Sequence, residues 1–192
     1  TVNLKDTSSL ASLVSTKVAL SANKEILTYT EGSVDTVMEF HTMRIPRGGE
    51  YVLVLSDGTT VYLNAESELT YPVKFSGKDR RVYLKGEAYF EVERDTCKPF
   101  IVEANSLEIQ VLGTEFGVRA YGDEECVRTT LKRGKVSVES EGCGVILTPN
   151  MQASFDKKTL QMDVREVNVD LFLGWKDGRL IFDNCSLEDI LK

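Results

Sequence analysis

The sequence has few of the residues that build metal and redox sites. It holds a single histidine, His41, and its four cysteines, Cys97, Cys126, Cys143 and Cys185, include no pair at CxxC spacing. A zinc site uses four ligands, usually cysteines and histidines in closely spaced pairs, so no metal site is expected. Four scattered cysteines are also too few for a disulfide scaffold in 192 residues, and they leave the redox compartment open.

Basic residues and long apolar runs are also scarce. There are 23 Lys and Arg against 30 Asp and Glu, which gives a formal net charge of −7 and a pI near 4.9. A nucleic-acid partner needs a basic surface, so none is expected, and an anionic membrane surface is disfavoured. Apolar runs such as Tyr51–Leu55 are far shorter than the roughly 20 residues that cross a bilayer. The chain begins at Thr1 rather than Met, so we expect a processed protein or part of a longer one, with any membrane anchor outside it.

Period-two alternation of apolar residues is the main pattern that is present. Val52 and Val54 lie on one side of an extended segment, and the apolar residues around them lie on the other. The turn signal Ser56–Gly58 follows, and a second segment rich in β-branched and aromatic residues ends at Leu63. These features predict a β-hairpin over residues 51–63.

The same alternation recurs at intervals of about ten residues, typical of an all-β protein. Turn signals at Lys85–Gly86 and Arg133–Gly134 predict further hairpins. The expected fold class is therefore all-β, a β-sandwich or barrel-like domain of short antiparallel strands. The expected strands cover residues 81–84, 87–92, 100–102, 107–112, 116–121, 127–131, 135–139, 145–147 and 152–155.

The two ends of the chain differ from this central part. Residues 1–44 are interpreted as a lead-in of short strands or partly flexible chain, either with a hairpin around Ser21–Asn23 or with a helix around Leu10–Val18. The all-β domain is expected over 45–168. Residues 169–192 have the strand-like run 179–182 and a helix-start pattern at Ser186, so they are expected to begin a small α/β domain that the chain truncates.

Glu87 and Glu91 are the best candidate pair for acid–base chemistry. In a strand these two residues share one face with Tyr89. Ala88, Phe90 and Val92 then lie on the opposite face, toward the core. Their Cα atoms would lie about 13 Å apart, whereas the carboxyls of an inverting glycosidase lie about 6.5–9.5 Å apart. A solvated polar strand face is the commoner explanation, and no catalytic residue is assigned.

Other isolated features carry no recognisable catalytic or cofactor motif. His41 has no accompanying nucleophile motif, and Gly48–Gly49 lacks the phosphate-loop pattern, so a β-turn or bulge is the better interpretation. Cys126 and Cys143 flank the hairpin expected at Arg133–Gly134. There they would be diagonal neighbours at roughly 7–8 Å, too far apart for a disulfide without a bulge. All four thiols stay unassigned.

Tyrosines in the expected strands offer an alternative function. A row of exposed aromatic rings could form a sugar-binding platform, although tyrosine in a strand is more often half-buried filler. The tyrosines concerned are Tyr62, Tyr71, Tyr83, Tyr89 and Tyr121. A non-catalytic carbohydrate-binding β-sandwich is therefore the alternative function, and a hydrolase with a spatially assembled site is a weaker third.

Several ordered motifs of this sequence resemble those of the FecR-like anti-sigma regulators. The resemblance covers roughly residues 40–192, and the motif variants are similar to those of the Bacteroidetes-type branch. At Gly117 the family pattern more often has Asn, which puts a local turn contact in doubt. The matching runs are Ile45–Tyr51, Leu53–Ala65, Leu69–Pro72, Val82–Val92, Lys98–Phe100, Val111–Thr114, Tyr121, Thr129–Leu131, Gly134–Val138 and Trp175–Phe182.

The resemblance implies a regulator rather than an enzyme, with no cofactor. Family members have a cytoplasmic segment that binds an extracytoplasmic-function sigma factor, one transmembrane helix, a periplasmic all-β domain and a small C-terminal α/β domain. This chain would be the periplasmic domain of such a single-pass inner-membrane protein. Its partners would be the signalling domain of an outer-membrane TonB-dependent receptor and, through the absent cytoplasmic segment, the sigma factor. We hypothesise that the segment from Trp175 contributes to the receptor contact, with edge-strand addition as a plausible docking mode.

Overall fold

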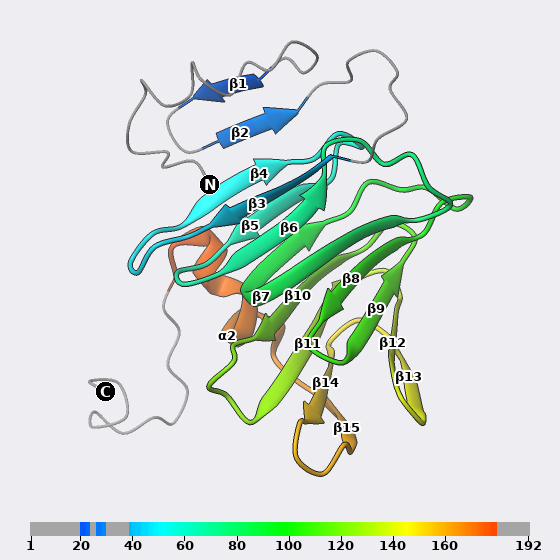
Figure 1. Ribbon diagram of the computed structural model, residues 1–192. Helices are drawn as coiled ribbons and strands as arrows, with labels where there is room; N and C mark the ends of the chain where they lie inside the picture. The colour runs from blue at the N-terminus through cyan, green and yellow to red at the C-terminus, as the bar shows by residue number, and fades with distance from the viewer. Residues whose placement is uncertain (1–19, 24–25, 30–38, 180–192) are drawn as a thin grey trace.

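Two sheets that share one long strand, β7 (Arg80–Glu91), make up most of this computed structural model, which describes residues 20–23, 26–29 and 39–179 (Figure 1). Sheet A runs in the order β1 (Leu20–Asn23), β2 (Ile26–Tyr29), β4 (Tyr51–Val54), β5 (Thr60–Leu63), β7, β10 (Glu115–Ala120), β11 (Cys126–Arg133), β14 (Met151–Asp156) and β15 (Met162–Glu166). Sheet B runs in the order β3 (Phe40–Arg44), β6 (Glu68–Pro72), β7, β8 (Phe100–Ala104), β9 (Leu107–Val111), β12 (Val136–Ser140) and β13 (Cys143–Leu147). The predicted all-β, barrel-like fold class is confirmed.

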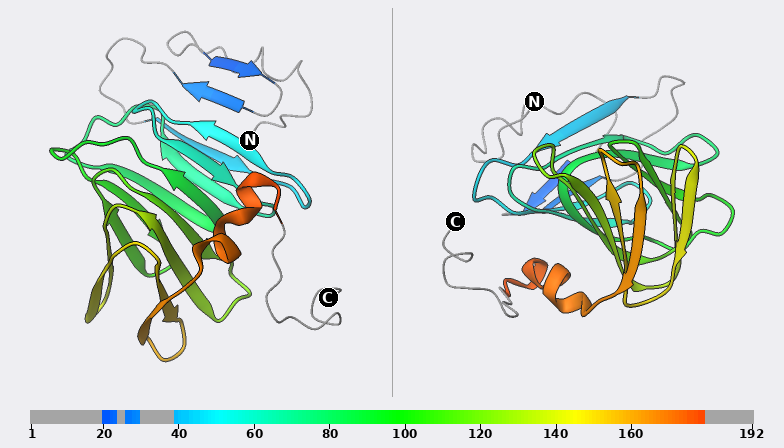
Figure 2. Two further views of the ribbon diagram at one scale, coloured as in Figure 1. Left: turned by 180° about the vertical axis from the view of Figure 1, so that it is seen from behind. Right: turned by 90° about the horizontal axis from the view of Figure 1, so that it is seen from below.

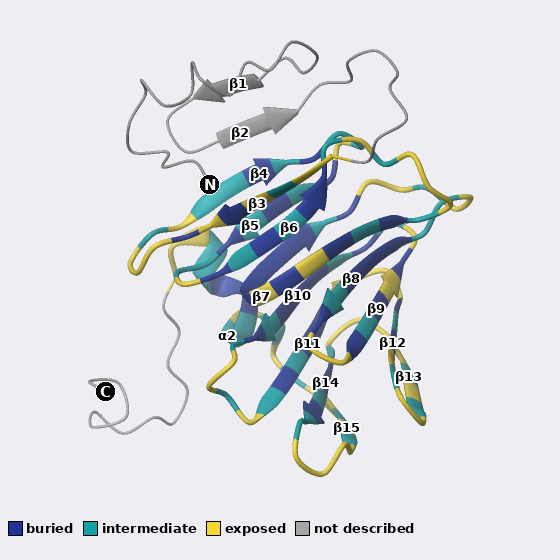
Figure 3. Cartoon of the chain, viewed as in Figure 1, coloured by how far each residue is buried: buried dark blue, intermediate teal, exposed yellow. Residues whose placement is uncertain are grey.

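Aliphatic and aromatic side chains of both sheets form one core, and the buried residues along the strands are dark blue in Figure 3. The ring of Phe90 stacks on that of Phe116, with ring centroids 5.2 Å apart, and it contacts Phe100 at 6.1 Å. Ala88, Phe90 and Val92 all belong to this core, so the predicted inward face of that segment is confirmed. Burying such rings is the main source of stability in a fold of this kind.

The turn predicted at Lys85–Gly86 is wrong, because β7 continues through both residues. Its first half pairs with β6 and β8 in sheet B, and its second half pairs with β5 and β10 in sheet A. Gly86 has φ +91°, and a Cβ atom there would lie 2.7 Å from the Cα of Ser67. Glycine therefore lets the strand bend from one sheet into the other without ending.

The hairpin predicted at Arg133–Gly134 is also wrong. β11 pairs with β10 and β14 in sheet A, whereas β12 pairs with β9 and β13 in sheet B. Gly134, with φ +98°, therefore lies at a crossing between the sheets. Cys126 opposes Asp156 and Cys143 opposes Ser140, so these cysteines are not the diagonal neighbours that the hairpin implied.

Other cysteine and hairpin predictions have mixed outcomes. Among the described residues Cys97, Cys126 and Cys143 are free thiols, and Cys185 lies outside the described range. The hairpin over 51–63 is confirmed as β4 and β5. β1 and β2 pair as the short strands expected in the lead-in, although Ser21–Asn23 lies within β1 rather than in a turn.

The two predicted domain boundaries remain predictions. β3, which the predicted boundary assigns to the lead-in, pairs with β6 along five residues. At the other end, the chain forms the short helix α2 (Val169–Leu173) and the 3₁₀ turn η2 (Gly174–Asp177). The side chain of Asn168 caps α2 by accepting a hydrogen bond from the Asp170 N–H. The strand expected over 179–182, apart from its first residue, and the helix expected from Ser186 lie outside the described residues.

Candidate functional site

The outer face of sheet A is covered by α2 and η2, which lie across it (Figure 2). We call the residues Glu87, Tyr89, Gly117 and Arg119 beneath this cover the covered face. The side chain of Leu173 is buried, and it occupies the space where Gly117 has no side chain. A Cβ atom at residue 117 would lie 2.4 Å from Leu173 Cδ2.

Gly117 therefore has a packing role in the middle of β10. It pairs with Tyr89 of β7 and Thr130 of β11, so it does not lie in a turn. The local turn contact that this departure puts in doubt is therefore not made at residue 117, which lies inside the strand. Where the family pattern more often has Asn, this chain has a residue small enough to let α2 approach the sheet closely.

Aromatic rings and a lysine extend the cover beyond Leu173. The ammonium of Lys176 lies 5.0 Å from the ring centroid of Tyr89 and 5.5 Å from that of Tyr62, which are cation–π distances. The hydroxyl of Tyr89 donates to Glu115 Oε2 at 3.2 Å, and burial raises the pKa of Tyr89. The indole Nε1 of Trp175 is buried with no hydrogen-bond partner among the residues that the structure describes.

Glu87 is the buried acid of the covered face. Its carboxylate accepts hydrogen bonds from Asn64 Nδ2 at 2.8 Å and from an Arg119 guanidinium nitrogen at 2.9 Å. Arg119 also donates to Glu124. Burial raises the pKa of Glu87, and this effect outweighs the attraction of Arg119. The solvated face predicted for this residue is therefore wrong.

The structure does not bring Glu87 and Glu91 into one acid–base site. Glu87 is held by Asn64 and Arg119, whereas Glu91 lies beside Tyr62 at the end of β7. Beside the contact of Leu173 with the sheet, a cavity of about 450 Å³ lies between α2 and the strands around Glu87. The strands contribute both polar and apolar residues to its lining, and the helical segment contributes apolar ones; the lining includes Glu87, Arg119, Arg128, Gln152, Phe172 and Trp175.

The remaining candidates from the sequence lie apart from one another. His41 lies on β3, where its Nε2 is 3.4 Å from Glu39 Oε1 and its ring meets the edge of Tyr71. The N–H of Gly49 donates to the carbonyl of Pro46 at 3.1 Å, so the turn interpretation of Gly48–Gly49 is confirmed. Within the described ranges, no group of three or more His, Cys, Asp or Glu side chains could hold a metal ion.

The five tyrosines do not form a common platform. Tyr71 and Tyr89 are buried. Tyr83 is exposed on sheet B, and the hydroxyl of Tyr121 donates to the Ala65 carbonyl at 2.7 Å. The arrangement gives no support to a carbohydrate-binding surface.

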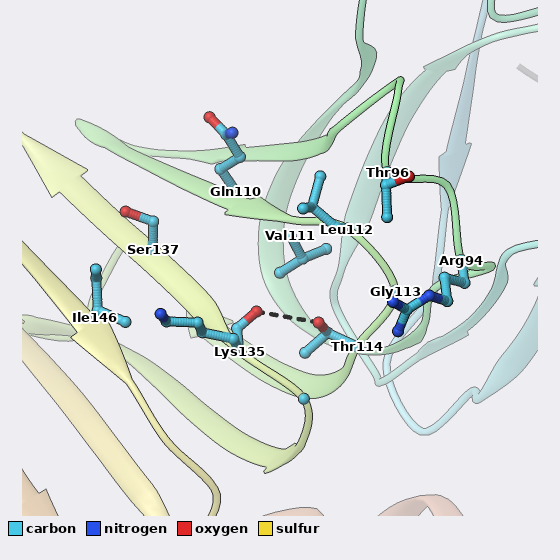
Figure 4. Close-up of a pocket in the computed structure, with 11 residues that line it drawn as sticks. Arg94, Thr96, Gln110, Val111, Leu112, Gly113, Thr114, Lys135, Ser137 and Ile146 are labelled. Carbon is cyan, nitrogen blue, oxygen red and sulfur yellow. Dashed lines mark hydrogen bonds between the residues drawn. The ribbon is translucent and has the colours of Figure 1, made fainter.

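A groove on the outer face of sheet B is a second candidate site, and sequence reasoning missed it (Figure 4). We call it the open groove; it has a volume of about 390 Å³, and its lining includes Arg94, Thr96, Gln110, Leu112, Lys135 and Ile146. These residues come from four separate chain segments. The segments that contain Gln110, Ser137 and Ile146 meet through strand pairing. Gln110 lies opposite Ser137, and Ser137 lies opposite Ile146.

Comparison with known proteins identifies the family. The model of the FecR protein family matches residues 41–142. The chain belongs to the FecR family. Two crystal structures of a candidate anti-sigma factor from Parabacteroides distasonis ATCC 8503, at 2.50 and 1.65 Å resolution, are similar to it, each with a TM-score of 0.73. Sequence identities are 30% and 31%, over 79% and 78% of this chain and 71% of each of those chains. No curated protein matches.

The residues matched by the FecR model include most of both candidate sites. The match contains the four residues of the covered face and most of the open groove, whereas α2 and η2 follow it in the chain. The motif resemblance to FecR-like anti-sigma regulators is thus confirmed. In the part of the chain that the structure describes, no helix has the length and apolar character needed to cross a membrane.

Proposed function

We propose that this FecR-family chain is the periplasmic domain of a membrane-anchored anti-sigma regulator. In this role it couples the signalling domain of an outer-membrane TonB-dependent receptor to an extracytoplasmic-function sigma factor, by protein–protein contact and without catalysis. The observation that carries the proposal is the family match, together with about 30% identity to a candidate anti-sigma factor over more than three quarters of this chain.

Within this proposal, the sigma factor binds a cytoplasmic segment outside the chain. The periplasmic domain transmits receptor occupancy through a conformational shift or through regulated proteolysis. The β-sandwich supplies a stable scaffold, and the continuous core between its sheets supports that role.

The segment from Trp175 is proposed to contribute to the receptor contact. Leu173 and Lys176 fix α2 and η2 on sheet A, so the chain leaves the β domain from a defined point. A partner that binds the residues after η2 would act on α2 and η2, which form a short segment held on the sheet by few contacts. Such a segment is well suited to change its position at a modest free-energy cost.

Calorimetric titration tests the proposal. The signalling domain of the TonB-dependent receptor encoded beside this gene is titrated into the full-length protein, and saturable one-to-one binding is expected. Replacing residues 175–192 with a glycine–serine linker should abolish or strongly weaken binding, whereas the exposed control Lys78→Gln should leave it unchanged. Equal affinity of the linker variant would reject the role of the segment, and absence of any binding would reject the receptor partner.

A further inference from the structure

Two exposed cations, Arg94 and Lys135, line the open groove. Among residues 39–179, neither Arg94 nor Lys135 pairs with a carboxylate. By contrast, Arg81 contacts three acids, and Arg128 contacts Glu124 at 3.0 Å. Because the whole chain carries a net charge of −7, two such cations at one groove form a local positive site on an acidic protein.

Apolar side chains line the groove between the two cations, at Leu112, and on the far side of Lys135, at Ile146. Leu112 is 43% exposed and Ile146 is 61% exposed, and both line the groove. In Figure 4, Arg94 and Lys135 stand on either side of Val111 and Leu112. A ligand that covered the exposed leucine and isoleucine would gain roughly 25 cal/mol for each Å² of apolar surface removed from water.

The groove is already formed in the free chain. The hydroxyl of Thr114 donates to the Lys135 carbonyl at 3.0 Å, and the Asp95 N–H donates to the Leu112 carbonyl at 2.9 Å. A Cβ atom at Gly113 would lie 2.8 Å from the Arg94 Cα, so this glycine lets the two loops meet. A preformed site loses little conformational freedom when it binds.

Neighbouring carboxylates do not neutralise the two cations. The Asp95 carboxylate accepts the backbone N–H groups of Cys97 and Lys98 within its own loop. Glu139 lies farther along β12, where it accepts a hydrogen bond from the Ser137 hydroxyl at 3.0 Å. The charges of Arg94 and Lys135 therefore remain available to a ligand.

We propose that the open groove binds an acidic, aliphatic segment of a partner protein in extended conformation. Two of its carboxylates pair with Arg94 and Lys135, an aliphatic side chain between them covers Leu112, and another beyond Lys135 covers Ile146. The cations stand on separate loops with an apolar floor between them, which suits two spaced carboxylates better than a single small anion. This surface belongs to sheet B, so the inference does not rest on the receptor contact proposed for residues 175–192.

Fluorescence anisotropy tests this inference with a labelled short peptide of alternating glutamate and leucine residues. The 192-residue chain should bind it saturably, and added salt should weaken the binding. The double variant Arg94→Gln, Lys135→Gln should bind about fivefold more weakly, which corresponds to about 1 kcal/mol for the two exposed pairs together. Ile146→Ser should also weaken binding. Lys78→Gln removes an exposed cation outside the groove and should change nothing.

Several results would overturn the inference. Equal affinity of the double variant and Lys78→Gln would show that the groove cations do not recognise the peptide. A peptide of alternating lysine and leucine that binds equally well would reject charge complementarity. Octanoate that competes at the same concentration as the peptide would indicate a small carboxylate ligand instead of a protein segment. No saturable binding at millimolar peptide would also reject it.

Discussion

The outer faces of the two sheets differ in what lies over them. On sheet A, α2 and η2 cover Glu87 and Tyr89, and the buried carboxylate is satisfied by two donors. On sheet B, the open groove leaves Leu112 and Ile146 exposed beside two cations that form no ion pair with any residue the structure describes. Antiparallel sheets commonly leave one face to solvent, so the covered face is the one that needs an explanation.

The explanation lies in a missing side chain. Gly117 removes the Cβ atom that would otherwise meet Leu173, and this space allows a five-residue helix to pack on the sheet. So short a helix has little stability of its own, and it depends on this contact. One small residue in a strand can therefore decide which face of a β-sandwich is covered.

The largest expected effect comes from breaking the strand that the two sheets share. Gly86→Ala places a Cβ atom against the Ser67 backbone at positive φ, and should lower the free energy of unfolding by about 3 kcal/mol. Gly58→Ala is the matched control, since its φ of +87° is similar but its nearest neighbour is Glu93 Cγ at 3.8 Å. It should cost about 1 kcal/mol. Guanidinium unfolding measures both, and equal losses would contradict the steric role of Ser67.

The second prediction compares one apolar residue from each outer face. Leu173→Ala should lower the free energy of unfolding by about 2 kcal/mol, because it removes the buried contact over Gly117. Ile146→Ala should change it by less than about 0.5 kcal/mol, because that side chain is exposed. Urea unfolding of both variants makes the comparison. If Leu173→Ala were as mild as Ile146→Ala, α2 would not be anchored by this residue.

The third prediction concerns pH and the buried acid. Burial raises the pKa of Glu87 above its ordinary value of 4.5, so the folded protein holds the proton more tightly than the unfolded chain. Its contribution to stability is complete below that value and decreases as pH rises through the folded pKa. Relative to Glu87→Gln, the unaltered protein should therefore lose stability as the pH rises from below 4.5 through the raised pKa of the folded state. Unfolding curves across this range test it, and a pH-independent difference would contradict it.

The smallest effect is expected at the open groove. Arg94→Gln and Lys135→Gln should each change the free energy of unfolding by less than about 0.5 kcal/mol, because neither side chain has a partner to lose among the described residues. Thermal unfolding checks this, with Arg119→Gln as a comparison that should be clearly destabilising because Glu87 loses a donor. A large loss at Arg94 or Lys135 would mean that the groove cations serve the fold.

Local patterns predicted where strands occur but not which strands pair. Alternation identified the β4–β5 hairpin, and it placed Phe90 in the core. The same alternation flanks Gly86 and Gly134 and predicts a turn at each, but the chain continues through or crosses between the sheets there. A glycine at positive φ serves a turn, a bulge or a crossing between sheets equally well, so the sequence pattern could not separate them.

The candidate sites were less predictable than the fold. The strand pattern singles out Glu87, but its carboxylate is held by Asn64 and Arg119, which are 23 and 32 residues away in the sequence. The open groove gave no signal along the chain, since Arg94, Leu112, Lys135 and Ile146 belong to different segments. Contacts between distant segments have no counterpart in a local pattern.

By itself, then, the sequence determined the all-β class, the positions of most strands and the FecR membership. Those properties follow from side-chain periodicity and from motifs that lie along the chain. Only the tertiary structure decided that β7 joins both sheets, that Gly117 receives Leu173, and that two cations meet an apolar floor on sheet B. Burial and charge pairing depend on which side chains become neighbours. Strand register determines those neighbours, and it is established only when distant segments of the chain have paired.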